Sequence, residues 1–196
     1  MNTPNVQLMR MAQDSLKGKW GLAIGTFLVY TLILAGVGSI HEPVNLLSLL
    51  IAGPLMLGAS MFSLTLARGK EARLEQILDG FRYFTNALVT YLLMVLYVVL
   101  WTLLLVIPGI IAALSYSMSF YILADDPATT PKDALDKSKK IMDGYKAKLF
   151  NLCLRFFLLA LLCVLTLGIG FLWLIPFVNI TMAKFYDDIK ENPINA

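Results

Sequence analysis

The chain has 196 residues, with 16 Lys and Arg, 13 Asp and Glu, and a formal net charge of +3. Apolar residues make up 58% of it and the mean hydropathy is +0.73, which excludes an ordinary soluble domain. The modest positive charge suits contact with anionic lipid headgroups and does not require nucleic acid as a partner.

Four uncharged runs define the predicted membrane spans. They contain 21 residues at 20–40, 25 at 43–67, 42 at 83–124 and 28 at 156–183. A helix needs about 20 apolar residues to cross a bilayer, so each of the first two runs is predicted to be one span. The third run is long enough for two spans, and Pro108-Gly109 divides it.

The fourth run is long for one span and short for two. A turn is possible in its middle, at residues 168–170. Two spans then fit if the first begins near Leu149 and carries Arg155 into the membrane. The sequence therefore predicts an all-α, polytopic membrane helical bundle with six spans, and a five-span chain is the alternative.

The basic residues are distributed so that one side of the membrane can receive all of them. The connections expected on the other side, near residues 41–43, 108–109 and 168–170, contain no Lys or Arg. Because cytoplasmic connections are enriched in these residues, both termini are predicted to be cytoplasmic. A five-span chain would place Lys184 and Lys190 outside, which favours six spans.

A short stretch with the apolar spacing of one helix face precedes three of the spans. The stretches contain Leu8, Ala12 and Leu16, then Leu74, Ile77, Leu78 and Phe81, then Leu135, Ile141 and Met142, and their polar turns contain Gly18, Gly80 and Gly144. The chain is therefore predicted to be a single membrane domain, 1–196, of three parallel repeats at roughly 6–67, 71–124 and 131–188. Each repeat would be an interfacial helix on the inner surface followed by two spans. The alternative is that these helices only connect spans.

The basic residues after the fourth predicted span are candidates for binding anionic headgroups or a membrane protein partner. They are Lys137, Lys139, Lys140, Lys146 and Lys148, with Arg155 further along the chain. An arginine at the centre of a span costs about 2.5–3.5 kcal/mol on insertion scales, so Arg155 is expected to extend its side chain to the headgroups. The alternative is an ion pair with a carboxylate at the inner rim. The candidates for that pair are Asp125, Asp126, Asp187 and Asp188.

Polar side chains concentrate in the fourth predicted span and suggest a seam for a headgroup or a small solute. The seam residues are Ser115, Tyr116, Ser119 and Tyr121, with Asp125 and Asp126 at the end of the span. Helix breaks are predicted at Gly53-Pro54, Pro108-Gly109 and Pro176, because proline removes a helix hydrogen bond. In membranes such breaks point to transport sites. The alternative for this span is close helix packing through the small residues Gly109, Ala113 and Ser117.

Residues typical of catalytic or metal centres are scarce. The single histidine, His41, has no partner near it in the sequence, and Cys153 and Cys163 lie about 15 Å apart along one helix. No phosphate-binding loop or nucleophile–base set is recognisable. The chain is therefore predicted to have no metal, no cofactor and no enzymatic activity.

The segments at residues 106–127 and 134–150 resemble a bacterial membrane family catalogued as domain of unknown function 975. The similarity also includes Gly53-Pro54 and residues 168–176, and it covers nearly the whole chain. It implies a multi-pass protein of the bacterial cytoplasmic (inner) membrane and implies no activity. Where members carry Ser-Phe-Ile-Gly-Trp, this chain has Arg155 followed by two phenylalanines and two leucines, which argues against Arg155 as a shared functional residue.

Two functional hypotheses follow from these patterns. The leading one is a non-enzymatic membrane component that binds lipid, a membrane protein partner or a second copy of itself. The alternative is a small transporter or channel whose path follows the fourth span.

Overall fold

The structure is a computed structural model that describes residues 3–38 and 46–192, and these residues are helical throughout apart from turns. The helices are α1 (Asn5–Leu16), α2 (Trp20–Gly38), α3 (Leu46–Ala67), α4 (Gln76–Asp79), the 3-10 helix η1 (Gly80–Tyr83), α5 (Phe84–Leu104), α6 (Val106–Tyr116), α7 (Ser119–Asp125), α8 (Pro131–Ile141), α9 (Lys146–Leu165) and α10 (Phe171–Glu191). The all-α prediction is confirmed for this part of the chain. The expected outer turn at 41–43, including His41, lies outside the described residues.

Five helical segments are long and apolar enough to cross a membrane. They are Trp20–Val37, Leu47–Ala67, Gln76–Leu104, Val106–Asp125 and Lys146–Leu165, and they coincide with the first five predicted spans. The sixth expected span corresponds to α10, which has 21 residues. Lys184, Asp187 and Asp188 lie in its last two turns, and these charges keep α10 out of the set of five.

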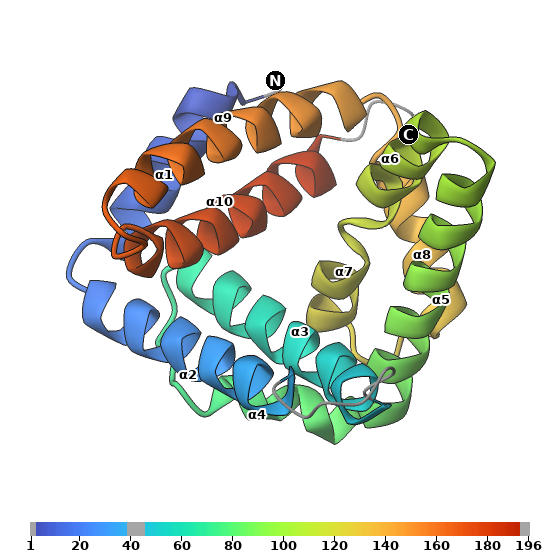
Figure 1. Cartoon of the computed structure of the whole chain (residues 1–196), viewed down its shortest axis with the longest axis horizontal. Coiled ribbons are helices and arrows are strands. Elements are labelled where there is room, and N and C mark those ends of the chain that lie inside the picture. Colours follow the sequence, from blue (N-terminus) through green and yellow to red (C-terminus); the bar gives the residue numbers. More distant parts are fainter. Residues whose placement is uncertain (1–2, 39–45, 193–196) are drawn as a thin grey trace.

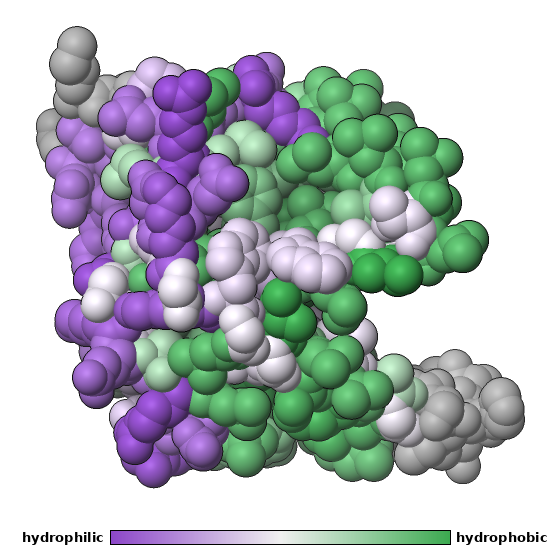
Figure 2. All heavy atoms as spheres, turned by 90° about the vertical axis from the view of Figure 1, so that its left-hand side faces the viewer, coloured by the Kyte–Doolittle hydropathy of each residue, from purple (hydrophilic) through white to green (hydrophobic). Residues whose placement is uncertain are grey.

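Polar and apolar residues occupy opposite sides of the molecule. Figure 2 shows hydrophilic residues gathered on one side and hydrophobic residues on the other, where two apolar lobes stand apart with a hollow between them. At the turns of the α5–α6 and α9–α10 hairpins, Leu103 is 79% exposed and Leu167 is 95% exposed. Exposed apolar surface of this extent needs a hydrocarbon environment. Together with the five apolar helices, it indicates a multi-pass membrane protein.

Helix α3 is the centre of the fold. Figure 1 shows three groups of helices, namely α1 with α9 and α10, α2 with α3 and α4, and α5 with α6, α7 and α8. Within the described residues α3 contacts members of all three groups. It meets α4 and η1 main chain to main chain, because a Cβ atom at Gly58 would lie 1.9 Å from the carbonyl oxygen of Ile77. A Cβ atom at Gly80 would lie 2.0 Å from the carbonyl oxygen of Pro54.

The predicted interfacial helices are present at α1 and α8, but their apolar faces are buried inside the protein. Leu8, Ala12 and Leu16 of α1 are fully buried, and α1 packs against α10. Ala134 and Leu135 of α8 are buried in the same way. The expectation that these faces enter the lipid is therefore wrong, because neighbouring helices cover them.

At the place of the second predicted interfacial helix the structure has the short α4, which no loop separates from the following span. Residues 76–104 form one helical run in which α4 and η1 lead directly into α5. Gly80 has an ordinary helical φ of −60°, whereas Gly18 and Gly144 adopt positive φ values of 73° and 81°, a region that favours glycine. The predicted glycine turn is therefore found after α1 and after α8 only.

Two of the three predicted helix breaks are wrong. Pro54 and Pro176 lie inside α3 and α10, which continue through them, because neighbouring helices and local adjustments accommodate a proline within a membrane helix. Near Pro108-Gly109 the chain does break, but at Leu105, where φ is −161° and ψ is 146°. The sequence did not predict the second break in this region, which separates α6 from α7 at residues 117–118.

Candidate functional site

A network of charged side chains joins three helix ends on the polar side. Arg68, which directly follows α3, donates from Nη1 to Oδ1 of Asp125 at 2.6 Å and from Nη2 to Oδ1 of Asp187 at 2.7 Å. Oδ2 of Asp125 also accepts from Tyr186 at 3.0 Å and from Lys190 at 2.5 Å. Hydrogen bonds from Arg68 to Asp187 and then Asp125 raise the pKa of the guanidinium. The arginine therefore stays charged and holds the ends of α3, α7 and α10 together.

A second ion pair joins the start of α9 to the end of α10. Nζ of Lys148 donates to Oδ2 of Asp188 at 2.7 Å, and the Asp188 side chain is only 6% exposed. The backbone N–H of Thr3 donates to the same carboxylate at 3.3 Å, and Asn5 donates to the carbonyl of Lys148 at 3.0 Å. Lys148, a predicted headgroup contact, is thus placed in an internal ion pair that anchors the N-terminal segment.

Arg155 is not part of either network. Its Nε donates to Oδ1 of Asn151, one turn earlier on α9, at 3.2 Å, and its side chain is exposed. Among the ion pairs of the described residues, none joins Arg155 to a carboxylate. The alternative of an Arg155 ion pair at the inner rim is therefore not found. An exposed side chain is compatible with the expected reach to the headgroups.

The predicted polar seam is divided among separate contacts. The hydroxyls of Ser115 and Ser119 donate to carbonyls one turn back, at 2.7 and 2.8 Å. Tyr121 is buried and donates to the carbonyl of Asn179 at 3.4 Å. Asp126 accepts from the Ala128 N–H at 3.2 Å in the turn before α8. These contacts give no support to a transport path along the fourth span.

The small residues of this span also face differently from the prediction. Gly109, Ala112 and Ser115 are the buried positions of α6, whereas Ala113 is exposed and Ser117 only half-buried. A Cβ atom at Gly109 would lie 2.2 Å from Oγ1 of Thr102, so the close approach is between α5 and α6. The buried small residues of α6 are therefore spaced three apart from Gly109 onward, and not four apart as predicted.

Ser138 is a structural residue that the sequence reasoning missed. Its buried hydroxyl donates to the carbonyl of Ser115 at 2.8 Å and accepts from the N–H of Met118 at 3.2 Å. It thereby satisfies two main-chain groups at the break between α6 and α7. Because Ser138 fixes the inner face of α8, the neighbouring Lys137, Lys139 and Lys140 all point outward. A serine within a lysine-rich helix gave no signal of this role.

Two adjoining cavities bring three of the predicted lysines together. One, of about 470 Å³, is lined by Asp136, Lys139, Lys140, Asp143 and Lys146. The other, of about 270 Å³, is lined by Trp101, Pro108, Ile111, Ala112, Ser115, Tyr116, Lys139 and Lys146. Lys139 and Lys146 line both cavities, so the charged cavity and the largely apolar one are neighbours. We call the charged cavity the mouth. Lys137 lines neither cavity.

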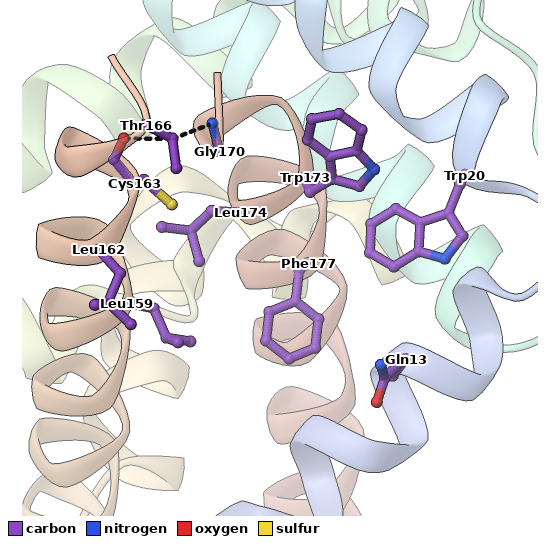
Figure 3. A pocket seen from close by; sticks show the side chains of 10 residues that line it. All are labelled: Gln13, Trp20, Leu159, Leu162, Cys163, Thr166, Gly170, Trp173, Leu174 and Phe177. Atoms are coloured by element: carbon purple, nitrogen blue, oxygen red, sulfur yellow. Dashed lines mark hydrogen bonds between the residues drawn. The ribbon is translucent and has the colours of Figure 1, made fainter. Parts of the chain in front are cut away.

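A separate apolar groove opens between α1, α2, α9 and α10, and Figure 3 shows its side chains. It has a volume of about 400 Å³ and is lined by Gln13, Trp20, Leu159, Leu162, Cys163, Thr166, Gly170, Trp173, Leu174 and Phe177. The Thr166 hydroxyl accepts from the Gly170 N–H at 3.0 Å and donates to the Cys163 carbonyl at 2.8 Å. With no charged side chain in its lining, the groove suits an apolar chain and offers no catalytic acid or base.

No group of three or more His, Cys, Asp or Glu side chains within the described residues is arranged to hold a metal ion. Cys153 and Cys163 are free thiols on α9. His41 lies outside the described residues.

Comparisons with known proteins identify one family and nothing closer. A family model described as a protein of unknown function (DUF975) matches residues 1–108 and 102–193. No curated protein and no solved structure matches the chain.

Proposed function

The chain belongs to the DUF975 family of proteins of unknown function, and from this premise we propose that it is a non-enzymatic protein of the bacterial cytoplasmic membrane that binds anionic headgroups. The supporting observation is the gathering of hydrophilic residues on one side of an otherwise apolar molecule (Figure 2). Lys139, Lys140 and Lys146 surround a cavity together with two aspartates. A cationic surface beside an anionic leaflet gains about 1 kcal/mol per lysine, and salt weakens the attraction.

We further propose that the chain crosses the membrane six times, with both termini in the cytoplasm. The Lys148–Asp188 pair links the end of α10 to the start of α9, and the Arg68–Asp187 pair links it to the end of α3. Helix α10 therefore returns to the side from which α9 starts. Its charged residues would then lie at the inner headgroups, where lysine side chains are favoured.

The proposed architecture is three parallel repeats in one domain. The first and third units share the order of a short helix, a glycine turn and a long hairpin, namely α1 with α2–α3 and α8 with α9–α10. Gly18 and Gly144 take the corresponding left-handed turns. The second unit, from α4 to α7, differs because its leading helix is continuous with α5.

Cysteine labelling in intact cells tests the topology. In a chain with both native cysteines changed to serine, Leu167→Cys should react with a membrane-impermeant maleimide, whereas Lys190→Cys should react only after the cells are opened. Leu167 is the matched outer position because it is 95% exposed at the α9–α10 turn. Labelling of Lys190→Cys in intact cells would mean that α10 does not cross.

Native mass spectrometry of the delipidated protein tests the lipid function. Phosphatidylglycerol and phosphatidylethanolamine with identical acyl chains would be added in turn, at low and high salt. We expect stronger retention of phosphatidylglycerol, and a weaker preference at high salt. Equal retention of both lipids would reject the function, and co-purification of a second chain without lipid would favour a protein partner or a homo-oligomer.

A further inference from the structure

We infer that Lys139 and Lys146 mark one discrete binding site for an anionic phospholipid, with its phosphate at the charged mouth and an acyl chain against α6. This inference rests on the proposed lipid-binding function and makes it specific. A diffuse cationic surface would hold many headgroups loosely, whereas the described cavities allow one lipid with both its polar and apolar parts in contact.

The shape of the site is amphipathic over a short distance. The cavity of about 470 Å³ is lined only by Asp and Lys side chains, and the one of about 270 Å³ is lined largely by apolar residues of α5 and α6. Lys139 and Lys146 belong to both linings, so a phosphate between them is adjacent to the apolar cavity. A free inorganic phosphate would use the mouth alone, and only a lipid would use both.

The charge at the mouth favours a singly charged phosphodiester. Three lysines and two aspartates line it, which gives a sum of +1 (three minus two). In the described part of the chain, the ion pairs use other cations, and none includes Lys139, Lys140 or Lys146. These ammonium groups therefore keep donors for a phosphate. Phosphatidylglycerol has one negative charge and an uncharged headgroup, so it matches this mouth better than a doubly charged monoester.

The apolar part of the site has room for a methylene chain. Trp101 and Ile111 are about half exposed at 49% and 46%, and the small Ala112 and Ser115 of α6 are buried at the same cavity. Tyr116 also lines this cavity, and its hydroxyl takes part in none of the hydrogen bonds found among the described residues. It is available to an ester carbonyl or a phosphate oxygen. Tryptophan and tyrosine are typical neighbours of lipid headgroups.

The apolar groove of Figure 3 supports this choice of site by contrast. None of its ten lining residues is charged, so a lipid tail there would not be selected by its headgroup. Selectivity for the lipid headgroup therefore distinguishes the site at Lys139 and Lys146 from the apolar groove, and the experiment measures this selectivity.

The test compares two double variants that remove the same charge from the same region of the full-length protein. Lys139→Gln/Lys146→Gln removes the proposed phosphate contacts, and Lys132→Gln/Lys137→Gln removes two exposed lysines of α8 that line neither cavity. Each delipidated protein would be titrated with phosphatidylglycerol or with phosphatidylethanolamine of identical acyl chains. Native mass spectrometry would measure the lipid that stays bound. Each lysine contributes about fivefold in affinity, so the first variant should bind the tightest phosphatidylglycerol about 25-fold more weakly. The control variant should change less than about fivefold.

Two further variants separate the site from a folding defect. Lys139→Arg/Lys146→Arg keeps both charges and should retain the tight lipid, and Ile111→Trp should weaken it by filling the apolar cavity while leaving the mouth intact. Equal weakening by the two glutamine variants would overturn the discrete site and leave the lipid-binding function standing. If the unmodified protein does not prefer phosphatidylglycerol, the proposed function fails and this site fails with it. Inorganic phosphate that binds the mouth as tightly as the lipid does would show that the acyl chain contributes nothing, and would also overturn the site.

Discussion

Replacing Gly58 with alanine adds one methyl group where α3 passes the main chain of α4. The new Cβ atom would lie 1.9 Å from the carbonyl oxygen of Ile77, 2.5 Å from its carbonyl carbon and 2.9 Å from its Cα atom. Ordinary carbon–oxygen contacts require about 3.3 Å or more. All three obstructing atoms belong to the main chain, so no side-chain rotation relieves the contact and the two helices must separate by about 1.4 Å.

The magnitude follows from two opposed effects. Overpacking a tight contact costs about 1–3 kcal/mol, and the rigid backbone places Gly58→Ala at the upper end of that range. The change of glycine to alanine in a helix returns about 1 kcal/mol. We therefore expect a net loss of about 2 kcal/mol, which for a chain of this size lowers the melting temperature by about 4–8 °C.

Thermal unfolding of the purified protein in detergent measures this loss. Gly25→Ala is the matched control, because it lies inside α2 and nothing lies within 4 Å of its added Cβ atom. The control should be unchanged or slightly more stable. If Gly58→Ala melts at the same temperature as Gly25→Ala, the close approach of α3 and α4 is not a constraint on the fold and the reasoning fails.

Two further substitutions test the polar contacts. Ser138→Ala removes the hydroxyl that satisfies two main-chain groups between α6 and α7, so hydrogen exchange there should speed up and stability should fall by about 1–3 kcal/mol. Ser117→Ala is its control, because that hydroxyl bonds only within its own turn. Lys148→Ala leaves the buried Asp188 carboxylate without its cation, with hydrogen bonds from Thr3 alone within the described residues, and should cost about 3–5 kcal/mol in denaturant unfolding, partly restored by adding Asp188→Asn. Lys17→Ala, in an exposed pair with Asp14, should cost less than about 1 kcal/mol.

The first five spans were predictable because charge and length decide where a helix can enter hydrocarbon. Which face of a helix meets protein was harder to predict, since lipid tails and a protein core are both apolar. The buried stripe of α1 was read correctly as Leu8, Ala12 and Leu16, yet its partner is α10 and not the bilayer. In α6 the sequence suggested Gly109, Ala113 and Ser117 as the packing face, whereas the residues buried by tertiary packing are Gly109, Ala112 and Ser115.

The candidate site was predictable only where its residues are neighbours in the sequence. Lys139, Lys140 and Lys146 lie close in the chain and do share a cavity. The Arg68 network joins residues 57 and 119 positions apart, and no local spacing rule reaches that far. The cations that pair with Asp187 and Asp188 are likewise distant in the sequence, namely Arg68 directly after α3 and Lys148 of α9.

The guanidinium of Arg68, which is shared by two aspartates, makes one end of the bundle more rigid than the other. A displacement of α7 or α10 at the polar side pulls on the same side chain, so these helices and α3 must shift in concert or not at all. The tips of the α5–α6 and α9–α10 hairpins have no comparable tether within the described residues. We therefore expect the amplitude of thermal motion to be smallest at the helix ends joined by Arg68 and to increase along the helices toward the hairpin tips.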